Sequence, residues 1–295
     1  MATPQTGIFA LGTMSHSYLE FALRPGADPD ALVRLVASLR EPRTTIGGVN
    51  LVAGFRPELW ASLSPKAIPP GLTGFNEPLV GGDGYSLPAT QWDVVVWLTG
   101  AAFDVVFDVS RGVVSALAPL ADLAHEIVGW PYHRDRDLTG FEDGTENPTL
   151  AEATTIVIVG AGSPGEGGSV LLLQQWAHDD AKWGSLTVDD QEQAMGRRKV
   201  SGEELDPKPA TSHVASTDQD DFGKIFRRNM PYGTVTDHGT MFVGFSAEQR
   251  PLAAMLESMA GLKTGARDAL TRYSRPVTGA YYFVPSADAL RGPVI

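Results

Sequence analysis

A nine-residue segment, GFEDGTENP (140–148), has the composition of a turn that could present a carboxylate. Asp143 is followed by Gly144, and an Asp-Gly pair favours a tight turn because glycine accepts positive φ without steric cost. A short acid on a rigid turn can be aimed at a substrate proton, which is the task of a general base. Composition alone favours a plainer interpretation, a structural turn in which Asn147-Pro148 caps a following helical turn.

A second group of polar residues follows later in the chain. His213 lies in SHVAS, and Arg227, Arg228 and Asn229 directly precede the turn-forming sequence MPYG. Histidine is a frequent metal ligand, and arginine, which is always charged, can stabilise developing negative charge. Taken alone, however, a lone histidine is more often a satisfied core or surface residue, and adjacent arginines are more often solvated ion-pair partners.

Composition narrows the classes of protein. The 295 residues contain 23 Lys and Arg against 35 Asp and Glu, and the net charge of −12 disfavours binding to nucleic acid or anionic lipid. The chain has no cysteine, which excludes disulfides, thiolate nucleophiles, iron–sulfur clusters and c-type haem attachment. Any metal or haem ligand must therefore come from His, Asp, Glu, Met or Tyr. None of the six histidines forms a close-spaced zinc motif, but a single axial histidine is still possible.

Hydropathy gives no indication of a membrane protein. No apolar run approaches the roughly 18 residues of a transmembrane helix. The N-terminal sequence lacks the basic region and apolar core of a secretory signal, so we expect a cytoplasmic protein.

Periodicity predicts alternating strands and helices in both halves of the chain. The first half has predicted strands at 15–23, 44–55 and 92–100, helices at 28–39, 57–63 and 110–127, a long ordered loop at 66–90 and an extended piece near 127–133. The second half has predicted strands at 167–179, 238–246 and 277–286, and helices at 186–199 and 247–261. This order fits an α+β protein of two related halves, with antiparallel sheets and helices packed on one face. GFEDGTENP falls where the halves join, and ligands often bind between domains.

Five motifs together resemble a known family. GFEDGTENP, GRRKVSGEEL, SHV, RRNMPYG and RYSRPVTGAYYFVPS occur in the order and at the spacing found in dye-decolorizing peroxidases, most closely their B-type branch. The resemblance covers nearly the whole chain. It implies two ferredoxin-like halves, residues 1–139 and 140–295, that form a dimeric α+β-barrel-like fold, with the haem ligand and the distal residues in the second half.

The resemblance also implies a site for one non-covalent haem b per chain. His213 matches the axial ligand of the iron, and Asp143, Arg227 and Asn229 match catalytic residues of the distal pocket, where hydrogen peroxide binds. Asp268 matches the acid that accepts a hydrogen bond from the ligand imidazole. The remaining matches near the haem are Gly144 of the turn and three residues close to the propionates, Glu146, Arg197 and Glu204.

The implied activity is that of a haem peroxidase. It reduces hydrogen peroxide through a ferryl intermediate and oxidises a small-molecule reductant, such as a dye-like or phenolic one-electron donor. Relatives usually self-associate, so we expect a homo-oligomer. Some are packed in protein nanocompartments by a C-terminal tail, and because the last strand is followed directly by RGPVI, we do not expect encapsulation here.

Three alternatives stay open from the sequence. One is a haem-handling or haem-storage protein with incidental peroxidase activity, against which the Asp143–Arg227 pair argues because storage needs neither residue. Another is a chlorite-decomposing haem enzyme on the same architecture, which the GFEDGTENP turn disfavours. The third is a haem-free interaction module in which these residues are structural.

Overall fold

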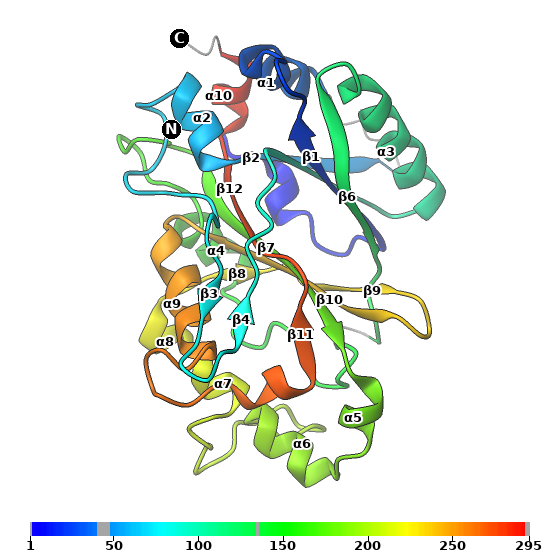
Figure 1. Cartoon of the computed structure of the whole chain (residues 1–295), viewed down its shortest axis with the longest axis vertical. Helices are drawn as coiled ribbons and strands as arrows, with labels where there is room; N and C mark the ends of the chain where they lie inside the picture. The colour runs from blue at the N-terminus through cyan, green and yellow to red at the C-terminus, as the bar shows by residue number, and fades with distance from the viewer. Residues whose placement is uncertain (1, 40–47, 134–135, 293–295) are drawn as a thin grey trace.

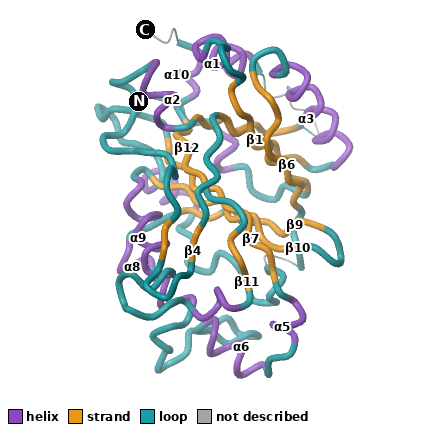
Figure 2. The backbone as a smooth tube through the Cα atoms, viewed as in Figure 1, coloured by secondary structure: helices purple, strands orange, loops and turns teal. Residues whose placement is uncertain are grey.

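The computed structural model describes residues 2–39, 48–133 and 136–292. Its central feature is a closed antiparallel sheet with helices on the outside (Figures 1 and 2). The strands of the ring follow the order β7-β12-β2-β5-β1-β6-β9-β10, and pairing between β10 and β7 closes it. Their bounds are β1 Ser15–Leu23, β2 Val49–Phe55, β5 Val94–Gly100, β6 Ala121–Gly129, β7 Ser169–His178, β9 Met230–Gly233, β10 His238–Ser246 and β12 Ala280–Val284.

Each half of the chain contributes four strands in the same order. The N-terminal half gives β2-β5-β1-β6 and the C-terminal half gives β9-β10-β7-β12, so in each half the first strand pairs with the third and the fourth. This is the ferredoxin-like arrangement, and the two quartets meet where β2 pairs with β12 and β6 with β9. The predicted α+β fold is confirmed, whereas the division at residue 139 stays a prediction.

Helices alternate with the strands along the chain. In the N-terminal half these are α1 Pro29–Ser38, α2 Pro57–Leu63 and α3 Phe103–Leu117. In the C-terminal half they are α4 Leu150–Ile156, α5 Asp180–Gly184, α6 Val188–Met195, α7 His213–Ser216, α8 Gln219–Phe222, α9 Gln249–Met259 and α10 Ala287–Arg291. Two 3-10 helices, η1 Thr6–Phe9 and η2 Ala269–Arg272, and the short strands β3 Leu79–Val80, β4 Ser86–Leu87, β8 Phe226–Arg227 and β11 Ser274–Pro276 complete the described chain.

Alternation along the strands sorts side chains between the inside and the outside of the ring. Residues such as Tyr18, Trp97 and Tyr282 form a buried cluster that joins strands of both halves. The neighbouring residues on the same strands, such as Leu19 and Val96, pack outward under α1 and α3. Because successive side chains of a strand point to opposite faces, each of these strands contributes to one core inside the ring and to another outside it.

The predicted helix at 110–127 is wrong over its second part. The helix is α3, which begins at Phe103 and ends at Leu117, and Ala121–Gly129 is the strand β6. Exposure alternates along ADLAHEIVG, a strand pattern that the neighbouring apolar helix conceals in the sequence. The predicted loop at 66–90 contains the short strands β3 and β4, and the part of the predicted strand 44–55 before Gly48 lies outside the described residues.

Within the described ranges, no helix combines the length and the apolar character needed to cross a membrane.

Candidate active site

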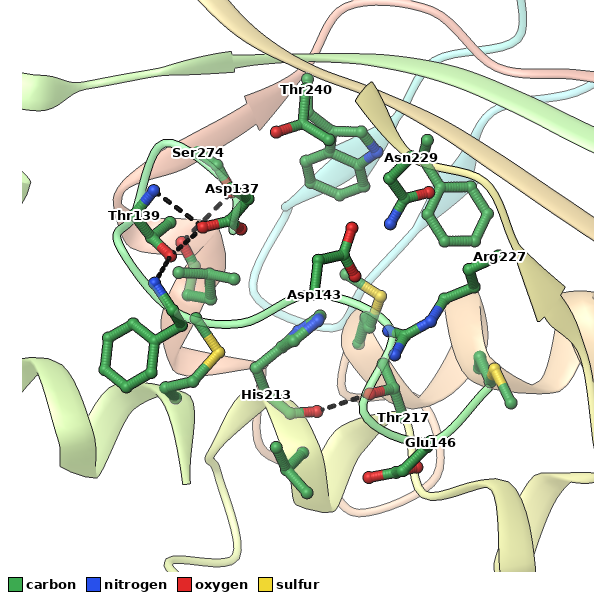
Figure 3. A pocket seen from close by; sticks show the side chains of 18 of the residues that line it. Asp137, Thr139, Asp143, Glu146, His213, Thr217, Arg227, Asn229, Thr240 and Ser274 are labelled. Carbon is green, nitrogen blue, oxygen red and sulfur yellow. Dashed lines mark hydrogen bonds between the residues drawn. The ribbon is translucent and has the colours of Figure 1, made fainter. Parts of the chain in front are cut away.

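A cavity lies between the outer face of the C-terminal sheet and helices α7 and α9 (Figure 3), and its empty space, counted together with the solvent at its mouth, is about 1330 Å³. Much of its wall is apolar and comes from β7, β10 and α9, namely Leu172, Trp176, Phe242, Leu252, Met255, Leu256 and Met259. A few polar side chains converge on it, among them Asp143, His213 and Arg227. An apolar wall with few placed polar groups is typical of a cofactor site.

His213 is the first residue of α7, and its imidazole is held by Asp268. Nδ1 lies 2.7 Å from Asp268 Oδ2, and Asp268 is fully buried at the N-cap of η2, where Oδ1 accepts from Leu270 N at 2.8 Å. Burial opposes a charge on the imidazole, but the carboxylate of Asp268 outweighs it and raises the pKa of His213. With Nδ1–H donated to the carboxylate, the lone pair of Nε2 is free for a metal in the cavity.

The GFEDGTENP segment forms the predicted turn. Gly140 and Gly144 have φ angles of 85° and 82°, in the left-handed region that favours glycine, and Asn147 N donates to Gly144 O at 2.9 Å. Arg136 Nη1 donates to Gly140 O at 2.7 Å and fixes the start of the turn. The Asp143 carboxylate lines the cavity and has no hydrogen-bond partner within the described part of the chain.

The predicted helix cap at Asn147-Pro148 is wrong. Thr149 is the N-cap of α4 and forms a capping box with Glu152. The Asn147 side chain instead binds the backbone of Arg227, because Oδ1 accepts from Arg227 N at 2.8 Å and Nδ2 donates to Arg227 O at 2.9 Å. The turn and strand β8 are therefore joined through this amide.

Arg227 and Asn229 reach the cavity from β8 and the residues that follow it. Arg227 Nε is buried and has no partner among residues 2–39, 48–133 and 136–292. Asn229 Oδ1 accepts from Val243 N at 3.0 Å, which leaves Nδ2 as the group that can donate into the cavity. Figure 3 shows the side chains of Asp143, Arg227 and Asn229 projecting into the cavity that His213 also lines.

Arg228, the neighbour of Arg227, has a different environment. It is buried, donates to Ile8 O at 2.9 Å and to Ala10 O at 2.6 Å, and lies 5.0 Å from the centre of the Trp97 ring. It therefore holds the N-terminal segment against the ring of strands and does not line the cavity.

The three predicted propionate residues come together at the rim of the cavity. Arg197 Nη2 lies 2.5 Å from Glu146 Oε1 and 2.8 Å from Glu204 Oε1. Arg197 and Glu146 line the cavity, whereas Glu204 contacts Arg197 without lining it. Gly144 and Asp268 do not line the cavity either, but Gly144 directly follows Asp143 and Asp268 bonds His213, and both of these neighbours do line it.

Three titratable residues of the cavity, Asp137, Glu142 and His178, were not predicted. The carboxyl of Asp137 lines the wall, and burial, followed by the charge of Asp143, raises its pKa to about 6. His178 lies 3.2 Å from Thr240 through Nε2 and Oγ1, and burial lowers its pKa to about 4. In the sequence, Asp137 looks like part of a solvated charged run, HRDRD, and no local signal marks His178.

These residues fit a haem. A flat, mostly apolar macrocycle suits the walls of β7, β10 and α9, and a neutral imidazole suits iron. Arg197 offers a cation for the propionates at the rim. The buried Arg227 Nε, with no partner in the described residues, indicates that a further ligand belongs in the cavity.

Comparisons with known proteins agree with this site. A family model described as Dyp-type peroxidase, C-terminal, matches residues 134–289. Dye-decolorizing peroxidase from Rhodococcus erythropolis is 37% identical over 85% of this chain and 76% of its own length, and that from Brevibacterium linens is 33% identical over 94% and 79%. Among solved structures, a dye-decolorizing protein from V. cholerae has a TM-score of 0.88 at 30% identity and covers 97% of this chain and 98% of its own. DyPB from Rhodococcus jostii has a TM-score of 0.87 at 31% identity, with 98% of each chain covered.

The chain belongs to the dye-decolorizing peroxidase family. It is a haem-dependent peroxidase, as the five motifs predict, and the haem-handling alternative is not favoured. The B-type branch and the roles of individual site residues stay predictions.

Proposed function

We propose that this cavity binds one haem b without a covalent link and that His213 Nε2 would hold its iron. The observation that carries the proposal is the pair formed by His213 and the buried Asp268, which orients one imidazole nitrogen toward a large apolar cavity. The carboxylate gives the imidazole anionic character, and a strongly donating ligand favours the oxidised iron of a peroxidase. One solved structure of a Rhodococcus jostii relative is described as a complex with heme.

Asp143 and Arg227 are the residues we propose to act on hydrogen peroxide. A bound haem would supply the redox chemistry, two-electron oxidation by peroxide followed by one-electron oxidation of a reductant. Asp143 accepts the proton of one peroxide oxygen and returns it to the oxygen that leaves. Arg227 stabilises the negative charge that develops on the leaving oxygen, and the burial of its Nε strengthens this interaction. The Nδ2 group of Asn229 donates a hydrogen bond that orients the peroxide.

At the rim, we assign the haem propionates to Arg197. Glu146 and Glu204 already share this guanidinium, so they limit how strongly it can bind another carboxylate. Gly144 keeps the turn that carries Glu146 in its left-handed conformation.

Stopped-flow absorbance of the haem-loaded protein with one equivalent of peroxide tests these roles. We expect a rapid shift of the Soret band in the parent and a rate about 10²–10³-fold lower in Arg227→Ala, the loss typical of a removed charge-stabilising donor. Asp143→Ala should be slower by about 10²-fold, the contribution typical of a general base. Arg24→Ala, which removes an exposed ion pair with Asp122, is the control. Equal rates in all four proteins would contradict the proposal.

We also propose that the enzyme works in the cytoplasm as a homo-oligomer. Phe103 and Phe107 on the outer face of α3 are 58% and 49% exposed and stack on each other, which supports self-association through this helix. Light scattering should give a mass above that of one chain, and Phe107→Asp should reduce it. A relative from Mycobacterium smegmatis is described as encapsulated, and the absence of encapsulation here stays a prediction.

A further inference from the structure

The short strand β8 is an edge strand whose outer side is occupied by a side chain. Arg227 lies opposite Gly244 of β10, and Arg228 N donates to Val243 O at 2.8 Å on that inner side. The N–H and C=O of Arg227 therefore point outward, and both are bonded by the amide of Asn147, at 2.8 Å and 2.9 Å. One amide thus takes the place of a neighbouring strand.

Asn147 also belongs to the turn that carries Asp143. Its backbone N–H donates to Gly144 O at 2.9 Å, so its main chain closes the turn while its side chain holds Arg227. A Cβ added at position 144 would lie 3.1 Å from Asn147 Nδ2. The residue that carried it would also have to adopt the backbone φ of +82° found at Gly144. Gly144 therefore allows the left-handed turn and also leaves room for the side-chain amide of Asn147.

The Asn147 side chain is not among the residues that line the cavity. It cannot act on peroxide directly, and its effect must pass through the two groups it joins. Asp143 and Arg227 are 84 positions apart in the chain, and with no partner for either side chain in the described residues, their relative position depends on their backbones. Misplacement by about 1 Å can lower a rate about 10²-fold.

We propose that Asn147 is a positioning residue for peroxide cleavage, because its bidentate amide holds the Asp143 turn in register with Arg227. This inference rests on the roles assigned above to those two residues. Aspartate at position 147 could accept from Arg227 N–H but could not donate to its C=O. Alanine could do neither.

Amide hydrogen exchange in the protein prepared without haem tests the contact itself. Asn147→Ala should raise the exchange rate of the Arg227 amide about tenfold or more and leave the amides of β1 and β5 unchanged. Asn50→Ala is the matched control, because Asn50 also donates from its amide to a strand carbonyl, Thr99 O, at a site far from the cavity lining. Unchanged exchange at Arg227 would overturn the inference.

The reaction with peroxide tests the consequence. In the haem-loaded protein, Asn147→Ala should lower the rate about 10- to 100-fold, with the Soret band of the resting enzyme unchanged. In the Arg227→Ala background, the same change should cost less than about threefold, because there is no guanidinium left to position. A loss of the same size in both backgrounds would show a general structural effect and overturn the inference.

The two proposals fail in different ways. If Asp143→Ala and Arg227→Ala leave the rate unchanged, the roles of these residues are wrong. If those variants are slow but Asn147→Ala reacts as fast as the parent, only the positioning role is wrong.

Discussion

The two halves of the ring share a strand order but use the outer faces of their sheets differently. In the N-terminal half, β1 and β5 present Leu19, Phe21 and Val96, which pack tightly under α1 and α3. In the C-terminal half, the corresponding strands β7 and β10 present Gln174, His178, Thr240 and Phe242 to a cavity. The same backbone can therefore hold a solid core or a cofactor site.

The connections between strands explain how the second face stays open. Residues 24–48 join β1 to β2, and α1 lies directly on the sheet. The equivalent connection, 179–229, is about twice as long and holds four short helices and the edge strand β8. It carries His213 and Arg227, whereas Asp143 reaches the cavity from the turn before β7.

The largest expected effect is that of a substitution in the packed outer face of the N-terminal sheet. Phe21→Ala should lower the free energy of unfolding by about 3–5 kcal/mol, the usual cost of removing a fully buried Phe, with little effect on haem binding. Phe242→Ala is the matched variant in the cavity wall and should cost about 1–2 kcal/mol, because its ring already borders open space. Urea unfolding without haem measures both. Equal losses would remove the distinction between the two faces.

A second comparison concerns two histidine–carboxylate pairs. Beside the cavity, His213 Nδ1 lies 2.7 Å from Asp268 Oδ2. Between strands β6 and β1, His125 Nδ1 lies 2.9 Å from Glu20 Oε2. Asp268→Asn keeps an acceptor but removes the charge, so the rate with peroxide should fall about 10- to 100-fold and the iron midpoint potential should rise. Glu20→Gln, measured per folded haem-loaded molecule, should change neither. A potential that does not move in Asp268→Asn would contradict the role of this carboxylate.

The smallest expected effect concerns the stability that the protein loses by burying the Asp137 carboxyl beside the cavity. Burial and the charge of Asp143 raise the pKa of Asp137 to about 6 in the folded protein, above about 3.9 in an unfolded chain. Folding therefore favours the protonated acid, and this contribution to stability is present below about pH 4 and lost as the pH rises through 6.

Asp137→Asn should remove the loss of stability that occurs as the pH rises through 6. Without haem, it should stabilise the protein by roughly 1–2 kcal/mol at pH 8, since water in the open cavity reduces the full effect, and by little at pH 4. Urea midpoints at the two pH values measure this. A variant that is destabilised equally at both would show that the carboxyl has a structural role only.

Much of this arrangement could be predicted from local sequence. Alternation located most strands of the ring, and Asp143-Gly144 identified its turn. The helix at 110–127 was placed wrongly because apolar residues on α3 and the alternating residues of β6 follow each other almost directly. Asn147 and His178 contact strands that are distant in the chain, at Arg227 and Thr240, and no local pattern in the sequence records these contacts. The site residues came from the family resemblance and not from periodicity.

A crystal structure of the haem-loaded protein tests the central claim most directly. The account predicts iron bound to His213 Nε2, with Asp143 and Arg227 on the other face of the haem and the Asn147 amide still on the Arg227 backbone. Iron bound to His178, or Asp143 and Arg227 on the same face as His213, would contradict it.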